Sequence, residues 1–271
     1  MKRIFVIGCA LFAISTVHAQ QKEGKVTYQR AAQMQARTFS INGMTQELPA
    51  SVRTDKFVLS FGNNSSLWKQ ADPDNDGETF SGGGDAEGFQ MRMVVAGSND
   101  VVYHNFDAAK RVEKREMFEK TFVIEDSVRP LKWKMTGETK TILGHTCMKA
   151  TATNITKRPQ TLIADGKIER KEITDTSTVE AWFANDIPVS GGPAEYQGQL
   201  PGLILEMNIG NGRIIYTALE ISPKVDVAII KEPTGKKRYT PAEFQKERDK
   251  MMDEMNKNMQ HGGGNRRIIM N

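Results

Sequence analysis

The sequence predicts a mainly β protein, built on a single strongly curved antiparallel sheet with one amphipathic helix near the carboxyl end. Apolar and polar residues alternate with a period of two along most of the chain, which is typical of half-buried antiparallel strands. Asn-Gly and Asp-Gly pairs separate several of these stretches and favour tight hairpins. Hydrophobic residues make up 38% and charged residues 26% of the 271, a composition that supports a sizeable core.

Residues 1–19 have the pattern of a cleaved signal peptide. Two basic residues precede an apolar run at 4–14, and Ala19 ends a small-residue cleavage pattern. We therefore expect export, to the periplasm or the outer membrane, and a mature chain that begins at Gln20. Lipidation at Cys9 is disfavoured because the apolar run continues past it. No later stretch is apolar enough to span a bilayer.

Residues 20–235 are predicted to form the antiparallel β domain. A long stretch at 63–88 is rich in Asn, Asp, Ser and Gly and is expected to be an exposed loop. Asp165-Gly166 and Gly210-Asn211-Gly212 predict hairpin turns. The expected strands lie at 26–28, 56–61, 89–95, 101–106, 112–124, 131–135, 139–143, 146–153, 161–164, 167–170, 178–183, 203–209, 213–221 and 225–230.

Residues 236–260 are predicted to be the amphipathic helix. Thr240 is a candidate N-cap, Pro241 suits the first helical position, and Glu243 completes a capping box. The Met and Phe stripe of this helix is expected to pack on the sheet, although it would also suit a partner or an anionic membrane surface. Residues 261–271 are expected to form a mobile basic tail.

The residues that could carry covalent chemistry are few. Removal of the signal leaves Cys147 as a single thiol, which cannot form an internal disulfide. His145 would share its strand face, but a small buried apolar role for the cysteine is favoured over a nucleophile. Asp186 and Glu195 flank a Pro/Gly-rich segment and are interpreted as surface charges. No catalytic residue is predicted.

One metal site is conceivable from the pattern of acidic residues. Asp72, Asp74 and Asp76 alternate before Gly77, as at the start of a calcium loop. Gly83 stands where an EF-hand has its bidentate Glu, so only a calcium site of another type would fit. A solvated acidic loop is the favoured alternative. No other cofactor is expected.

The charge balance gives no sign of nucleic-acid binding. The precursor carries 37 basic and 33 acidic residues, and the signal peptide accounts for two of the basic ones. The remaining excess is local, with 10 basic and 6 acidic residues in 231–271. The body of the protein is therefore close to neutral.

Residues 181–207, AWFANDIPVSGGPAEYQGQLPGLILEM, resemble the signature block of the GLPGLI family, exported proteins typical of Bacteroidetes-type bacteria. An upstream block at 144–150, GHTCMKA, is similar to the Gly-x-x-Cys-x-Lys-Ala strand of that family. Gln199 departs from the pattern, where the family has Gly. The resemblance covers about 130–230 and implies no biochemical activity and no catalytic residues. The matching positions are Ala181, Trp182, Phe183, Ile187, Pro188, Ser190, Gly192, Pro193, Gly198, Leu200, Pro201, Gly202, Leu203 and Ile204.

The same block has a physical interpretation that needs no ligand. Leu200-Pro201-Gly202-Leu203 predicts a type II turn, with Gly202 at positive φ. Such a turn would fix strand register and direct alternate residues into a core. Pro188, Gly192 and Pro193 would stiffen the loop before it. The residues expected to face the core are Leu203, Leu205, Met207 and Ile209.

We favour a non-enzymatic binding module, which would hold an apolar ligand, lipid or peptide on the concave face of the sheet. The order of the strands and turn is similar to the half-barrel of periplasmic lipoprotein carriers, a likeness of fold that transfers no function. Trp133, Trp182 and Tyr196 are the candidate ligand contacts, although Trp182 would equally cap the core. A structural or partner-docking envelope protein is the alternative. A hydrolase that uses Cys147 or a carboxylate pair is the least favoured.

Overall fold

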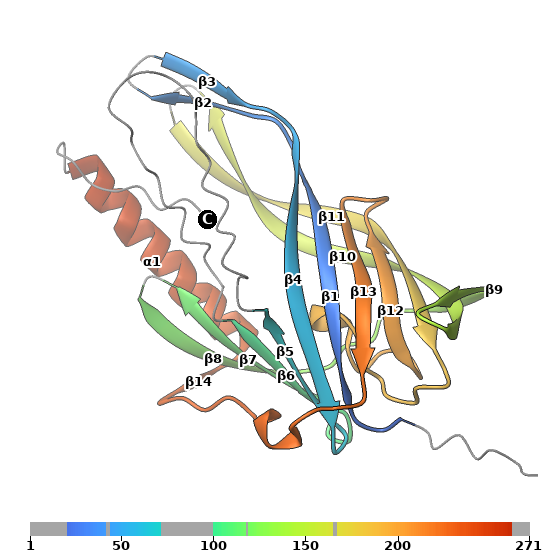
Figure 1. Ribbon diagram of the computed structural model, residues 1–271. Helices are drawn as coiled ribbons and strands as arrows, with labels where there is room; N and C mark the ends of the chain where they lie inside the picture. The colour runs from blue at the N-terminus through green and yellow to red at the C-terminus, as the bar shows by residue number, and fades with distance from the viewer. Residues whose placement is uncertain (1–20, 42–43, 72–99, 118, 165–166, 262–271) are drawn as a thin grey trace, which may run out of the picture.

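One 12-stranded sheet dominates the computed structural model, which describes residues 21–41, 44–71, 100–117, 119–164 and 167–261 (Figure 1). Its strand order is β14-β8-β7-β6-β5-β4-β1-β13-β12-β11-β10-β9, and the sheet is open. The strands are β1 (Gly24–Met34), β4 (Ser51–Gly62), β5 (Ser65–Gln70), β6 (Val101–Asn105), β7 (Lys110–Met117), β8 (Lys120–Ser127), β9 (Lys134–Ile142), β10 (His145–Ala164), β11 (Lys167–Ala184), β12 (Leu203–Ile209), β13 (Ile214–Ser222) and β14 (Arg238–Tyr239). A separate hairpin joins β2 (Arg37–Ile41) and β3 (Met44–Leu48).

The prediction of a mainly β fold with one carboxyl-terminal helix is confirmed. All strand pairs of the large sheet are antiparallel except β14 with β8, so the sheet is mixed rather than purely antiparallel. Strand β1 lies in the middle, between β4 and β13. From there the chain builds two arms, the β5–β8 arm and the β9–β12 arm, which diverge on either side of β1 and β4 in Figure 1.

The central core joins both arms. Val26 and Tyr28 of β1 are fully buried, as the alternation of their strand predicts. Leu59 of β4 and Phe183 of β11 belong to the same cluster. The expected core residues Leu203, Leu205, Met207 and Ile209 are all buried there as well. The largest core cluster therefore spans both arms, and two smaller clusters lie on the β5–β8 arm.

Polar residues form one row across the inner face of the β5–β8 arm. Ser66, His104, Arg111 and Asp126 are register partners on four successive strands, so their side chains point to the same side. The opposite face of this arm packs Tyr103, Val112 and Val123 against Leu67 and Ile230.

The prediction of an exposed loop at 63–88 is wrong for the first part of that range. Only Asn63 and Asn64, at φ 51° and 53°, form a turn, and Ser65–Gln70 is strand β5. This strand forms because it pairs on both sides and buries Trp68, which outweighs its polar composition. Residues 72–99, which include the strand expected at 89–95, lie outside the described residues.

Other strand predictions also need correction. The pairs of strands expected at 131–135 and 139–143, at 146–153 and 161–164, and at 167–170 and 178–183 are single strands, β9, β10 and β11. The ladder at 112–124 is two strands, because the chain turns between Met117 and Lys120 while its alternation continues unbroken. The strand expected at 131–135 begins only at Lys134, so residues 131–133 lie before it. The strand expected at 225–230 is instead the 3-10 helix η2, Val227–Ile229, where the Asp226 carboxylate accepts from the Ala228 N–H at 3.0 Å.

The predicted type II turn at 200–203 is also wrong, because Gly202 is not at positive φ. Gly198 adopts that conformation instead, at φ 75°. Glycine is needed at 202 for space, since a Cβ atom there would lie 2.2 Å from the backbone oxygen of Ala184. Gly202 therefore lets its own backbone approach the backbone of Ala184 at the end of β11. This role differs from the predicted one, which is to supply a positive φ in a type II turn.

The helix α1 spans Pro241–His261, so it begins later than the predicted 236 and includes the first residue of the expected tail. The capping box is confirmed: the Glu243 N–H donates to Thr240 Oγ1 at 3.2 Å, and the Thr240 N–H donates to Glu243 Oε2 at 2.8 Å. Phe244 and Met251 pack on β8 through Phe122 and Ile124. Among the described helices, none is long and apolar enough to cross a membrane. The expected signal peptide and residues 262–271 lie outside the described residues.

Candidate functional site

The family-like block forms a loop inside the curve of the sheet. We call residues 187–202 the motif loop; it connects β11 to β12 and carries the 3-10 helix η1, Ala194–Tyr196. Ile187, Tyr196 and Leu200 are only 1–3% exposed, because they pack in the central core with residues of both arms. The motif loop therefore fills the curve with its own side chains.

Backbone hydrogen bonds hold the motif loop in place. The Gly198 N–H donates to the Ser190 carbonyl at 2.6 Å, and the Ile204 N–H donates to the Gly191 carbonyl at 3.0 Å. From the central strand, the Tyr28 hydroxyl donates to the Ile204 carbonyl at 2.6 Å. Buried polar groups of the loop thus find partners within the fold, as a core element requires.

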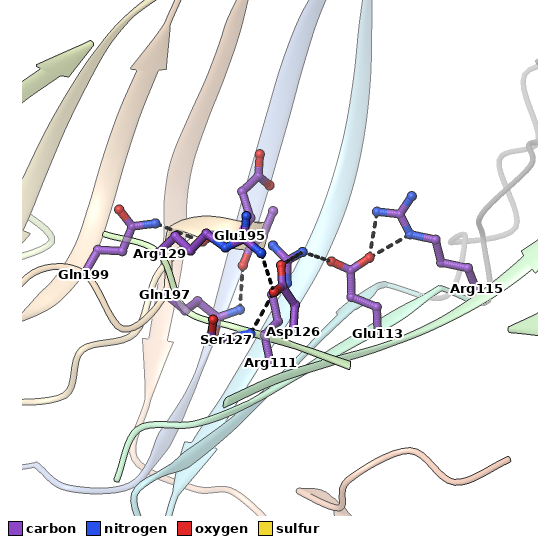
Figure 2. Close-up of polar contacts among 10 residues, drawn as sticks. Arg111, Glu113, Arg115, Asp126, Ser127, Arg129, Glu195, Gln197 and Gln199 are labelled. Carbon is purple, nitrogen blue, oxygen red and sulfur yellow. Dashed lines mark hydrogen bonds and ion pairs between the residues drawn. The ribbon is translucent and has the colours of Figure 1, made fainter. Parts of the chain in front are cut away.

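Gln197 connects the motif loop to the β5–β8 arm. Its side chain is fully buried. Its Oε1 accepts from the Ser66 hydroxyl at 2.5 Å. Its Nε2 donates to the Ala194 carbonyl at 2.9 Å, which is the dashed line drawn from Gln197 in Figure 2. Both ends of the amide are therefore engaged.

Gln199, which departs from the family pattern, ties the motif loop to the segment before β9. Its Oε1 accepts from the Leu131 N–H at 3.0 Å and from Trp133 Nε1 at 3.1 Å. Its Nε2 donates to the Glu195 carbonyl at 3.1 Å, the contact at the left of Figure 2. The side chain that departs from the motif therefore has a structural role.

A chain of five alternating charges lies beside the motif loop on the inner face of the β5–β8 arm. We call Arg129, Asp126, Arg111, Glu113 and Arg115 the charged network (Figure 2). Successive nitrogen–oxygen distances along it are 3.0, 3.7, 3.0 and 2.7 Å. The register of β7 and β8 produces this order, since Arg111 lies opposite Asp126 and its strand presents every second residue to the same face.

The charged network is buried in its middle and exposed at its ends. The side chain of Glu113 is 6% exposed, whereas those of Arg115 and Arg129 are 45% and 77% exposed. Interior members are fixed by their ion pairs, and the end arginines reach solvent in defined positions. The charged network therefore presents two exposed guanidinium groups, each paired with a less exposed carboxylate.

Glu195 adds an exposed carboxylate near these arginines. Although the residue reaches solvent, the protein packed around η1 raises the pKa of its carboxyl group, while its own backbone hydrogen bond and the charges of Arg111 and Arg115 oppose that shift. The neighbouring Tyr196 is buried, which raises the pKa of its phenol to about 12, and its oxygen accepts from Asn154 Nδ2 at 3.4 Å. The exposed surface at η1 thus carries charges of both signs.

The three predicted ligand contacts lie in different surroundings. Tyr196 is in the core, and Trp133 is hydrogen-bonded to Gln199. Trp182 lies beside two lysines, with the Lys140 ammonium 4.3 Å and the Lys149 ammonium 5.6 Å from the centre of an indole ring. Each ring therefore has a structural partner of its own.

Cys147 has the environment of a packed residue. It is fully buried, and this burial raises the pKa of its thiol to about 11. The thiol donates to the His145 carbonyl at 3.6 Å. The imidazole of His145 instead pairs with Asp186, Nδ1 to Oδ2 at 2.7 Å, so it is directed to another partner.

An open groove of about 760 Å³ lies where α1 begins. The turn before β7, the end of β8 and residues 238–243 line it. Ion pairs cross this region: Lys110 binds Glu232 at 3.0 Å, and Arg238 binds both Glu125 and Glu232. These pairs hold the segment before α1 against β8.

No cluster of three or more His, Cys, Asp or Glu side chains suited to a metal occurs within the ranges that the structure describes. Asp72, Asp74 and Asp76, the candidate calcium ligands, lie outside those ranges. The calcium site therefore stays a prediction.

Sequence reasoning missed the charged network, Gln197 and His104. Glu113 and Arg115 alternate within the strand predicted at 112–124, which signals a shared face, and Arg111 lies just before that predicted strand. Their partner Asp126 becomes visible only once the turn between β7 and β8 is known, because that turn sets the register. No local pattern links Gln197 to Ser66, which is 131 residues away.

A family model described as "Protein of unknown function (Porph_ging)" matches residues 133–206, which is about a quarter of the chain. The match runs from Trp133 through the motif loop into β12. No curated protein shows significant sequence similarity to the chain. Two solved structures of PNGF-II, in the C2 and P21 space groups, are similar at 16% identity with a TM-score of 0.49. Each comparison covers 83% of this chain and 32% of the other, so the chain spans about a third of the length of PNGF-II.

Proposed function

We propose that the chain is an exported, non-enzymatic docking module of the bacterial cell envelope, in the periplasm or at the outer membrane. We also propose that it belongs to the GLPGLI family. The blocks at 144–150 and 181–207 support the family assignment, and both lie largely within the matched range 133–206. The pattern of residues 1–19 supports export.

The observation that carries the docking function is that the curved face is filled with side chains and bordered by exposed charges. Ile187, Tyr196 and Leu200 occupy the space inside the curve that an apolar ligand would need. Arg115, Arg129 and Glu195 are exposed, and the Arg115 guanidinium lies 5.8 Å from the centre of the Phe244 ring of α1. This arrangement favours partner docking over the carriage of an apolar ligand.

The mixture of charges indicates the kind of partner. Two arginines and one carboxylate would complement a protein segment that carries both acidic and basic side chains. A lipid tail offers no charge, and an anionic head group would meet Glu195 as well as the arginines.

The state of Cys147 supports the non-enzymatic part of the proposal. A cysteine nucleophile acts as the thiolate, which requires a lowered pKa and access to the substrate. In Cys147 burial raises the pKa to about 11 and removes access. The thiol form of a hydrolase is therefore disfavoured.

Site-specific photocrosslinking in the native envelope tests the proposal. A photoreactive amino acid replaces Glu195 in one strain, and Glu220, an exposed carboxylate on β13, in a control strain. We expect discrete adducts from position 195 and none from position 220. Arg115→Glu with Arg129→Glu should abolish the adducts, and high salt should weaken them.

Two outcomes would overturn the docking proposal. The first is equal labelling, or none, from positions 195 and 220. The second is a stoichiometric lipid or other apolar molecule in native mass spectra of the protein purified from the envelope, since the filled core leaves no room for one.

A further inference from the structure

His104 of β6 is a fully buried polar side chain that makes no hydrogen bond to the described part of the protein. Burial, reinforced by the charge of Arg111, lowers the pKa of its imidazole to about 3, so the ring is neutral near pH 7. A neutral imidazole has one N–H donor and one acceptor nitrogen. Among the residues that the structure describes, neither Nδ1 nor Nε2 has a hydrogen-bond partner.

Arg111 brings a third unpaired nitrogen to the same place. It is the register partner of His104 on β7, so the two side chains share a face, with Cβ atoms about 5 Å apart. Its terminal Nη2 binds Glu113 and Asp126. Its Nε–H is buried and has no partner within the described part of the chain.

The neighbours on the other side of His104 direct their hydrogen bonds elsewhere. Ser66 is the register partner of His104 on β5, and its hydroxyl donates to Gln197. The amide nitrogen of Gln197 donates to Ala194 instead of to the histidine. The three unpaired nitrogens therefore lie in a polar seam, bounded by His104, Arg111, Ser66 and Gln197, between the motif loop and the β5–β8 arm.

We propose that two ordered water molecules occupy this polar seam, one at each ring nitrogen of His104. The two nitrogens point in different directions from the ring, so a single water would not reach both. The water at the unprotonated nitrogen donates to it, and the water at the N–H accepts from it. One of the two also accepts from Arg111 Nε–H.

Energetics favours hydration of the polar seam over dry packing. Each buried polar group that is left unpaired costs about 1–3 kcal/mol. Buried waters occur where they bond such groups, with about three hydrogen bonds each. The waters would thus pair the buried polar groups of β6 and β7 beside the Ser66–Gln197 bond that joins the arm to the motif loop.

The sign of the stability change in His104→Phe tests the proposal. If waters bridge the seam, the variant loses those bridges and leaves Arg111 Nε–H unpaired, so the unfolding equilibrium constant should rise about tenfold. If the seam is dry, the variant removes two unpaired nitrogens, and the constant should stay unchanged or fall, which would overturn the proposal. Tyr103→Phe is the matched control, because it removes one hydrogen bond, to Ser65 at 3.1 Å, on the opposite face of β6.

A high-resolution crystal structure of the unaltered protein gives a second, independent test, which also decides the matter if His104→Phe does not fold. We expect one water within hydrogen-bond distance of each ring nitrogen, and one of them shared with Arg111 Nε. Protein atoms bonded to both ring nitrogens, from any part of the chain, would contradict the proposal.

Discussion

Gly202 is the residue at which the packing of the motif loop is least tolerant. A Cβ atom there would lie 2.2 Å from the Ala184 oxygen and 2.8 Å from the Ala184 carbonyl carbon. These are backbone atoms, so no side chain can rotate out of the way. The residue therefore sets the distance between the end of β11 and the start of β12.

We predict that Gly202→Ala destabilises the protein by about 3 kcal/mol, because the backbones must separate and the core around Leu203 must open. Chemical denaturation measures the loss. Gly137→Ala is the control: its φ is 81° but nothing lies within 4 Å of the added atom, so only the conformational penalty of about 1 kcal/mol applies. Equal losses in the two variants would show that the close approach at Gly202 is not the cause.

Gln199→Ala should destabilise the protein by about 2 kcal/mol. The substitution removes the acceptor shared by the Leu131 N–H and Trp133 Nε1 and leaves both donors without a protein partner. Denaturant unfolding gives the magnitude, and a red shift of tryptophan fluorescence reports the loosened Trp133. Gln199→Glu retains an acceptor oxygen and should lose clearly less. If alanine is as stable as glutamine at this position, the three bonds contribute little.

The free energy of unfolding should decrease as the pH is lowered, because His104 titrates. The pKa of its imidazole is about 3 in the folded state and near 6.5 in the unfolded chain, so between these values the unfolded chain binds the extra proton. The contribution of the neutral ring is therefore complete above about pH 6.5 and is lost as pH falls toward 3, with a slope of about 1.4 kcal/mol per pH unit. Denaturation curves of the unaltered protein and His104→Phe should show this difference in slope from pH 6 to pH 4. Identical slopes would contradict the assignment.

Helix α1 is attached to the rest of the molecule by a small contact of its own. Phe244 packs on Phe122 with ring centres 5.2 Å apart, and Met251 completes that cluster, which is separate from the central core. The capping box fixes where the helix begins, and ion pairs hold the segment before it. The helix is therefore expected to detach without loss of the sheet.

Phe244→Ala should release α1 locally. We expect faster hydrogen exchange of the amides in α1, by about tenfold or more, and unchanged exchange of β1, because the lost contacts belong to the separate cluster. The control is Gln245→Ala, an exposed neighbour on the same helix. Slower folding and faster exchange throughout β1 would indicate that α1 belongs to the main cooperative unit.

Elements with strong local patterns were predictable from the sequence, and those defined by distant partners were not. Thr240, Pro241 and Glu243 specify the capping box and the start of α1 by themselves, although the predicted helical range begins too early, at 236. Ser65–Gln70 has a polar composition and forms a strand because β4 and β6 lie on either side of it. Val225–Ile230 has a strand-like composition, yet the Asp226 side chain caps a helical turn there.

The candidate site was less predictable than the fold for the same reason. Alternation places Arg111, Glu113 and Arg115 on one face, but the charged network also needs the register that brings Asp126 opposite Arg111. Trp133 and Trp182 attract notice as aromatic residues in a β protein. Their partners, Gln199 in one case and two lysines in the other, are set by the path of the motif loop and by cross-strand pairing.

At the scale of the whole molecule, the two arms and the motif loop form one body. The central cluster combines Leu59 and Trp68, near the β5–β8 arm, with Cys147 and Phe183 of the β9–β12 arm. Tyr196 and Leu200 of the motif loop lie in the same cluster. The motif loop thus packs inside the curved sheet. The surfaces that remain for partners are the exposed charged residues.

Residue-resolved amide hydrogen exchange of the motif loop tests this central claim most directly. Gly191, Gly198 and Ile204 donate backbone hydrogen bonds inside the fold, so their amides should exchange as slowly as those of Val26 and Tyr28 in β1, by global unfolding alone. Exchange of the loop amides about a hundredfold faster than that of β1 would mean that the loop opens independently, and the curved face would then be a gated cavity instead of a filled core.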